Sequence, residues 1–177
     1  SMVERLGARP LKVNLPIGAE DTFTGVVDLL EMNARIEHEE DLGATFETAT
    51  IPAEMAGEAE AARLEMIETV AEVDEELAEL FIAETEPTVE QLTAGIRRAT
   101  LAGEIVPVFC GSALKNKGVQ KLLDAIVEFL PSPLDRPAIA GTGKDGKGAE
   151  TRDPADEEPF SALVFKILAD PFSGRLA

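Results

Sequence analysis

The sequence predicts a mixed fold of the α+β and α/β classes, with a small antiparallel sheet packed by helices and a separate βα unit. Three observations lead to this prediction. Short stretches with strand-like alternation come first, a long segment with helical periodicity follows, and one apolar run then leads through a polar loop into a last helix. With 45% hydrophobic residues, the 177-residue chain can bury a core.

Three short strands are predicted in the first part of the chain. Residues 25–30 and the alternating stretch 32–37 form the first two, residues 45–51 form the third, and Gly43 lies in the turn before it. We expect these strands to make the small sheet.

Two or three helices are predicted to follow. Ala, Glu, Leu and Met dominate from Pro52 to about Ala83, and Asp74 could cap a second helix within this stretch. Thr88 and Gln91 form a capping-box signature, which predicts a helix through about Ala102 that Gly103 ends.

The first of these helices is predicted to be amphipathic. Its apolar side, expected to face the sheet, consists of Leu64, Ile67, Val70 and Ala71. Its acidic side consists of Glu54, Glu58, Glu65, Glu72 and Glu76. Only Arg63 interrupts the helix, so we expect few internal salt bridges to offset the repulsion. The acidic side is either simply solvated or docks a basic partner.

The net charge of -18 is concentrated in one segment. Residues 1–19 sum to +2, residues 20–104 to -19 and residues 105–177 to -1. So acidic a chain is not expected to hold nucleic acid or an anionic membrane by direct charge pairing. The charge difference between segments predicts two units with different partners.

The βα unit provides the candidate ligand loop. Residues 105–110 are predicted to be a strand buried on both faces, residues 111–118 a polar loop, and residues 119–130 a helix that Pro131 ends. Ligands of open α/β sheets bind at the carboxyl ends of strands, so this loop is where a site is expected.

Other motifs are rejected on their chemistry. Gly141, Gly146 and Lys147 have P-loop spacing, but Gly148 stands where a magnesium-binding Ser or Thr is needed. Asn116-Lys117-Gly118-Val119 lacks the carboxylate of a guanine-reading motif. His38 is interpreted as a surface residue and Cys110 as a core residue, and the acidic clusters lack a calcium-binding loop. We therefore expect no catalytic residues and no metal ligands.

The two ends suggest a piece of a longer protein. Ser1 precedes Met2, as after removal of a tag, and residues 160–168 read as a strand that has no partner. Residues 134–158, rich in Pro, Gly and charge, are predicted to be a linker. Apolar runs are too short to span a bilayer and a signal peptide is not evident, so a soluble, cytoplasmic protein is expected.

Three stretches carry a family resemblance. The first begins with Leu15-Pro16-Ile17-Gly18-Ala19-Glu20-Asp21 and continues to Leu29. The second runs from Val108 to Gln120 and contains Gly111-Ser112-Ala113-Leu114-Lys115-Asn116-Lys117-Gly118, and the third is Leu130-Pro131-Ser132-Pro133-Leu134-Asp135. Together these stretches resemble bacterial elongation factor G. The resemblance implies that residues 1–18 and 105–133 are parts of a P-loop-type GTPase domain and 19–104 its G-prime insertion. It also implies that residues 159–177 begin a second, β-barrel domain.

The function expected from this resemblance is that of a longer translocating GTPase, which uses GTP/GDP and Mg²⁺ to move tRNA and mRNA on the ribosome. Ser112, Ala113 and Leu114 resemble the loop that buttresses guanine, and the acidic insertion resembles a docking surface for the C-terminal domain of the ribosomal stalk protein. By itself the chain is expected to be inactive and to bind neither GTP nor Mg²⁺. A paralogous ribosome-protection or recycling GTPase and a stand-alone acidic adaptor remain alternatives.

Overall fold

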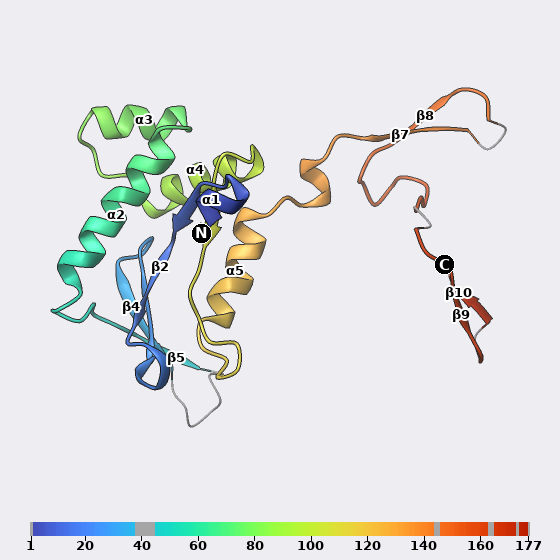
Figure 1. Ribbon diagram of the computed structural model, residues 1–177. Coiled ribbons are helices and arrows are strands. Elements are labelled where there is room, and N and C mark those ends of the chain that lie inside the picture. The colour runs from blue at the N-terminus through green and yellow to red at the C-terminus, as the bar shows by residue number, and fades with distance from the viewer. Residues whose placement is uncertain (1, 38–44, 144–145, 163–164, 173, 177) are drawn as a thin grey trace. The chain divides into compact units, whose positions relative to one another are not determined.

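The computed structural model describes residues 2–37, 45–143, 146–162, 165–172 and 174–176 (Figure 1). It contains two compact units, Ser1–Leu130 and Pro131–Ala177. His38, interpreted above as a surface residue, and Gly43 lie outside the described residues.

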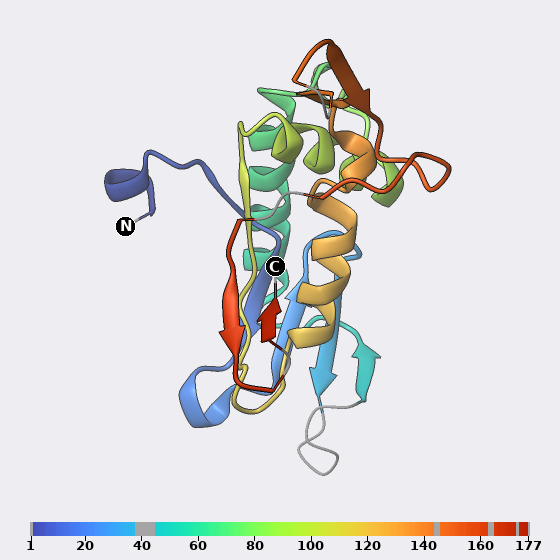
Figure 2. The same cartoon turned by 90° about the vertical axis from the view of Figure 1, so that its right-hand side faces the viewer.

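The first unit contains a parallel pair of strands and a four-stranded antiparallel sheet (Figures 1 and 2). The parallel pair consists of β1 (Pro10–Lys12) and β6 (Val106–Val108). The antiparallel sheet has the order β2-β3-β4-β5 and consists of β2 (Asn14–Ile17), β3 (Gly25–Asp28), β4 (Asn33–Glu37) and β5 (Phe46–Ala49). The three predicted strands are therefore confirmed, and β2 is an additional strand that the sequence analysis did not identify.

Val13 joins the two sheets. Its amide donates to the carbonyl of Val108 beside the parallel pair (3.1 Å), and its carbonyl accepts from the amide of Leu29 at the end of β3 (3.1 Å). Its side chain is fully buried. The antiparallel sheet is consequently fixed to the strand that leads into the candidate loop.

Five helices occur in the described part of the first unit. They are α1 (Met2–Leu6), α2 (Ala56–Ala71), α3 (Glu75–Ile82), α4 (Val89–Leu101) and α5 (Val119–Phe129), with a 3-10 turn η1 (Glu20–Thr22). The predicted restart is confirmed, because the Asp74 carboxylate caps α3 by accepting from the Leu77 amide (3.1 Å). The capping box is confirmed too: Thr88 and Gln91 exchange hydrogen bonds of 3.0 and 3.2 Å.

No helix in the described ranges combines the length and apolarity that crossing a membrane requires.

The buried side of α2 differs from the predicted one. Ile67 and Val70 are buried as expected, but Leu64 is 52% exposed and Ala71 only partly buried. The core side is instead completed by small and flexible residues, namely Ala59, Ala62 and Met66. The assignment of Leu64 was wrong, because this side chain lies at an open hollow lined also by Phe81 and Ile82 of α3, which do not cover it.

The prediction that β6 is buried on both faces is also wrong. Val106 is 40% exposed, and the strand covers only three of the six predicted residues. In the described structure β6 pairs with β1 along one edge, and this leaves part of the apolar run uncovered.

The second unit consists of a 3-10 turn and two hairpins. The turn η3 spans Pro133–Asp135, and β7 (Ile139–Thr142) pairs with β8 (Ala149–Arg152) while β9 (Leu168–Asp170) pairs with β10 (Gly174–Leu176). Gly141 thus lies in a hairpin strand, as expected for a segment that is not a P-loop. The boundaries predicted for the linker and the second domain remain predictions.

The strand predicted over 160–168 is wrong in the described residues. Residues 160–162 and 165–167 are irregular, and Phe160 and Phe165 are 95% and 89% exposed. A strand needs a neighbour for its backbone groups, and pairing begins only at Leu168, where β10 supplies one.

Asp74 provides a test of how α3 is held. Asp74→Ala is expected to lower the free energy of unfolding by about 2 kcal/mol, since it removes a helix cap and the partner of Arg98, whose Nε lies 2.6 Å from Oδ2. Asp74→Asn keeps a cap oxygen and should lose less. Urea unfolding followed by circular dichroism measures both, with the exposed Glu75→Gln as control.

The same variants give a pH dependence. The hydrogen bond from Arg98 holds the pKa of the Asp74 carboxyl below its ordinary value of 3.8. The stabilisation is therefore fully present above pH 3.8 and is lost as the pH falls through the lowered pKa. The original chain should have a higher free energy of unfolding than Asp74→Asn, and this difference should become smaller as the pH falls. A difference that stayed the same on acidification would contradict this assignment.

Candidate functional site

The candidate loop follows β6 and leads into α5, as the sequence predicts. A two-residue antiparallel bridge closes it: the Ser112 amide donates to the Lys117 carbonyl (2.8 Å) and the Lys117 amide to the Ser112 carbonyl (2.9 Å). Asn116 has a φ of 54° and Gly118 a φ of 77°, so the chain turns through the left-handed region twice before the helix begins. The loop has a defined, tightly closed shape.

The predicted residues Ser112, Ala113 and Leu114 lie together on this loop. Within the described structure, the amides of Ala113 and Leu114 donate to no protein acceptor, and the Leu114 side chain is 98% exposed. The loop borders a hollow of about 190 Å³, whose lining includes Phe109, Ser112 and Ala113. Two free main-chain donors beside a hollow can bind a carbonyl oxygen of a planar ligand.

Two buried polar contacts fix the base of the loop to the antiparallel sheet. Lys117 is almost fully buried, and its Nζ donates to the carbonyl of Phe23 (2.9 Å). The Gly118 amide, at the start of α5, donates to Oε1 of the buried Glu37 on β4 (2.5 Å). Burial raises the pKa of the Glu37 carboxyl, although the Gly118 hydrogen bond and the Lys117 charge oppose this shift.

Asn14 makes a third contact with the strand end. Its Oδ1 accepts from the Cys110 amide (2.8 Å) and its Nδ2 donates to the Cys110 carbonyl (3.2 Å). Cys110 itself is half-buried, and burial raises the pKa of its thiol. A thiol held in its neutral form is a poor nucleophile, but Cys110 is not the fully buried core residue that the sequence predicted.

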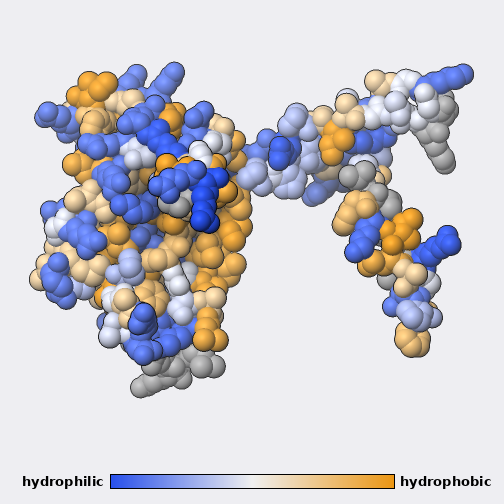
Figure 3. Space-filling view, viewed as in Figure 1, coloured by the Kyte–Doolittle hydropathy of each residue, from blue (hydrophilic) through white to orange (hydrophobic). Residues whose placement is uncertain are grey.

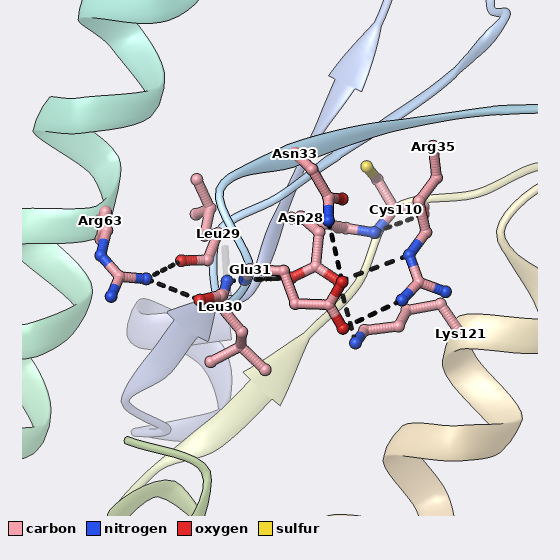
Figure 4. Close-up of polar contacts among 10 residues, drawn as sticks. Asp28, Leu29, Leu30, Glu31, Asn33, Arg35, Arg63, Cys110 and Lys121 are labelled. Atoms are coloured by element: carbon pink, nitrogen blue, oxygen red, sulfur yellow. Dashed lines mark hydrogen bonds and ion pairs between the residues drawn. The ribbon is translucent and has the colours of Figure 1, made fainter. Parts of the chain in front are cut away.

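A buried carboxylate ties the sheet to α5 (Figure 4). Asp28, at the end of β3, has Oδ2 2.9 Å from Nζ of the buried Lys121 on α5 and 3.7 Å from Nε of Arg35 on β4. Its Oδ1 accepts from the amides of Leu30 and Glu31 (2.9 and 3.2 Å). One carboxylate therefore connects two strands, a turn and the helix that follows the loop.

The five predicted acidic residues do not form one uniform face. Glu65 pairs with Lys12 (2.8 Å), Glu72 pairs with Arg9, and Glu76 lies on α3, where it pairs with Arg98 (2.9 Å). These pairs are not internal to the helix, so they do not bear on the expectation of few internal salt bridges; the bases come from segments distant in sequence and offset part of the repulsion. Glu54 and Glu58 are exposed and have no ion pair within the described structure.

Arg63 is not part of the acidic side. Its Nη1 donates to the carbonyls of Leu29 and Leu30 (2.6 and 2.8 Å), and its Nε pairs with Glu86 (2.8 Å) (Figure 4). The one base within α2 therefore anchors this helix to the turn after β3.

Apolar hollows were not anticipated from the sequence. Leu64, Phe81 and Ile82 line a hollow of about 450 Å³ between α2 and α3. Another, of about 410 Å³, lies between β6 and α5 and includes Val106 and Ile126, where hydrophobic side chains gather on the surface (Figure 3). Both follow from helices that carry apolar residues on more than one side.

In the described structure, the loop offers main-chain hydrogen-bond donors and not metal ligands. The described residues contain no group of three or more His, Cys, Asp or Glu side chains that could hold a metal ion. The Mg²⁺ expected for the longer protein therefore has no such ligand group among the described residues.

Several residues of the site escaped the sequence analysis. Asn14, Glu37, Lys117 and Lys121 were not singled out as contacts of the loop. Polar residues of these types are usually exposed, and the sequence contains no local signal that they are buried.

Comparison with known families decides the relationship. Residues 36–132, a little more than half of the chain, match the family described as the elongation factor Tu GTP binding domain. The chain belongs to this family. The match to the elongation factor Tu GTP-binding family includes the loop, α5 and all of the acidic helices.

A solved structure gives the same relationship over nearly the full chain. A protein of Thermus thermophilus, known from its crystal structure, is similar to 98% of the chain with a TM-score of 0.71 and 25% sequence identity. The chain spans 23% of the length of that protein. The translational GTPase relationship predicted from the sequence is confirmed at this level, and GTP/GDP is the nucleotide of the elongation factor Tu GTP-binding family.

The Asp28–Lys121 pair gives a test of the buried link. Lys121→Met keeps most of the side-chain volume but leaves the Asp28 carboxylate without its nearest cation, so the free energy of unfolding should fall by about 3 kcal/mol. Lys12→Met, which breaks an exposed pair, should cost less than about 1 kcal/mol. Urea unfolding provides both values.

Adding Asp28→Asn to Lys121→Met should recover part of the loss, because the buried charge is then removed as well. If the Lys121 and Lys12 variants lowered the free energy of unfolding equally, the buried pair would contribute no more to stability than the exposed pair.

Proposed function

We propose that the chain is a segment of a translational GTPase of the elongation factor G type, a protein that promotes movement of tRNA and mRNA on the ribosome. In this proposal Ser112, Ala113 and Leu114 contact the guanine of GTP or GDP, while the acidic helices dock a ribosomal protein. The family match and the three motif stretches around residues 15–29, 108–120 and 130–135 support this choice within the translational GTPases.

The observation that carries the nucleotide role is the pair of free amides on the loop. The Ala113 and Leu114 amides have no acceptor in the described structure, although the amides of Ser112 and Lys117 on both sides are used to close the loop. A base carbonyl supplies the missing acceptor without any rearrangement of the loop. The serine and the tight turn then buttress the edge of the ring.

A proline substitution tests this role in the longer GTPase. Ala113→Pro removes one amide donor, and Ser112 before it already lies in the extended bridge that a following proline favours. Loss of one hydrogen bond to the base should accelerate GDP dissociation about tenfold, measured with a fluorescent nucleotide by stopped flow. Leu114→Ala is the matched control, since it keeps the amide and shortens only an exposed side chain. Equal dissociation rates for the two variants would refute the base contact.

The acidic side of α2 supports the docking role. Glu54 and Glu58 are exposed and unpaired in the described residues, whereas Glu65, Glu72 and Glu76 each have a basic partner. The proposed partner is the C-terminal domain of the ribosomal stalk protein, whose lysines would meet this side. Charge complementarity of this kind raises the association rate and weakens with salt.

Two double variants, one on the acidic side of α2 and one away from it, test the docking role. Glu54→Gln with Glu58→Gln removes unpaired charge and should slow association with the stalk domain by about threefold or more at low salt, as measured by stopped flow. Glu104→Gln with Glu128→Gln removes the same charge after α4 and on α5, and should leave the rate unchanged. If both double variants slowed association equally, net charge and not this side of α2 would be responsible.

A further inference from the structure

The loop that we propose to contact guanine is not shaped by its own sequence alone. Cys110, Lys117 and Gly118, at the two ends of the loop, make polar contacts with Asn14 on β2, with Phe23 just before β3 and with Glu37 on β4 respectively. The contacts join residues 96, 94 and 81 positions apart. They enclose both ends of the short segment from Ser112 to Asn116 that carries the free amides.

We propose that Glu37 and Lys117 are positioning residues of the loop, so that the antiparallel sheet sets the geometry with which the Ala113 and Leu114 amides meet a nucleotide base. This inference rests on the proposed base contact. In this arrangement both residues act through the backbone of the loop.

The geometry gives each residue a separate task. Glu37 accepts from the amide of Gly118, which has a φ of 77° and begins α5, and so fixes the point where the loop becomes a helix. The chain passes close to Cys110 there, since a Cβ added to Gly118 would lie 3.1 Å from the Cys110 carbonyl oxygen, so this position favours glycine. Lys117 holds the same end from the other side through the Phe23 carbonyl and is itself half of the bridge with Ser112.

Burial makes these contacts effective. Glu37 and Lys117 are both buried, and the second carboxylate oxygen of Glu37 has no hydrogen-bond partner among the described residues. Removing the Glu37 side chain would leave the Gly118 amide without its acceptor in a place with little access for water. An unpaired buried donor is more costly than a lost exposed hydrogen bond, so the loop end is expected to shift or open to recover a partner.

Amide hydrogen exchange on the full 177-residue chain tests the positioning directly. Glu37→Ala should raise the exchange rates of the Ser112 and Lys117 amides, which close the loop, about tenfold or more. Exchange of the Leu92 amide in α4 should stay unchanged. Glu37→Gln, which retains an acceptor oxygen, should restore protection, and Glu60→Ala on the exposed side of α2 is the control. Lys117→Met should raise the exchange rates of the same two amides although Glu37 is unchanged.

Nucleotide kinetics in the longer GTPase then separate the two proposals. Glu37→Ala should raise KM for GTP and the GDP dissociation rate about tenfold with kcat unchanged, and Glu37→Gln should restore both. Unchanged exchange at Ser112 and Lys117, or an equal increase at every amide including Leu92, would overturn the positioning role. Opened loop amides with unaltered GDP dissociation would support positioning and refute the base contact.

Discussion

The buried Asp28 carboxylate is the interaction on which the first unit depends most. It lies at the end of β3, caps the turn to β4 through the amides of Leu30 and Glu31, and pairs with Lys121 on α5. Each of these groups belongs to a different part of the chain, so one charge fixes the sheet, the turn and the helix in a common frame. A buried charge requires such partners, because an unpaired one would destabilise the fold.

The position of the candidate loop follows from that frame. Lys121 places the first turn of α5 against the sheet, and the Gly118 and Lys117 contacts fix the residues just before it. The loop itself is then free to expose main-chain donors. A rigid sheet that supports a short exposed loop is a common way to obtain precise geometry without burying the binding groups.

The acidity of the chain also has a structural explanation. Much of it lies on α2 and α3, where Lys12, Arg9 and Arg98 from other elements neutralise part of it. The remaining exposed glutamates, among them Glu54 and Glu58, give a defined side of one helix a local excess of charge. The total of -18 therefore describes neither the loop nor the whole surface.

The sequence by itself determined helices α2 to α5, the caps at Asp74 and Thr88, three strands of the antiparallel sheet, the place of the loop and the family resemblance. These features depend on residues a few positions apart, whose spacing can be read directly. Only the tertiary structure decided that Leu64 is exposed and that residues 160–162 form no strand. It also decided that Glu65 and Glu72 form ion pairs. Finally, it decided that Glu37 and Lys117 hold the loop. The last contacts join residues 81 and 94 positions apart, and no local pattern specifies which distant groups will meet.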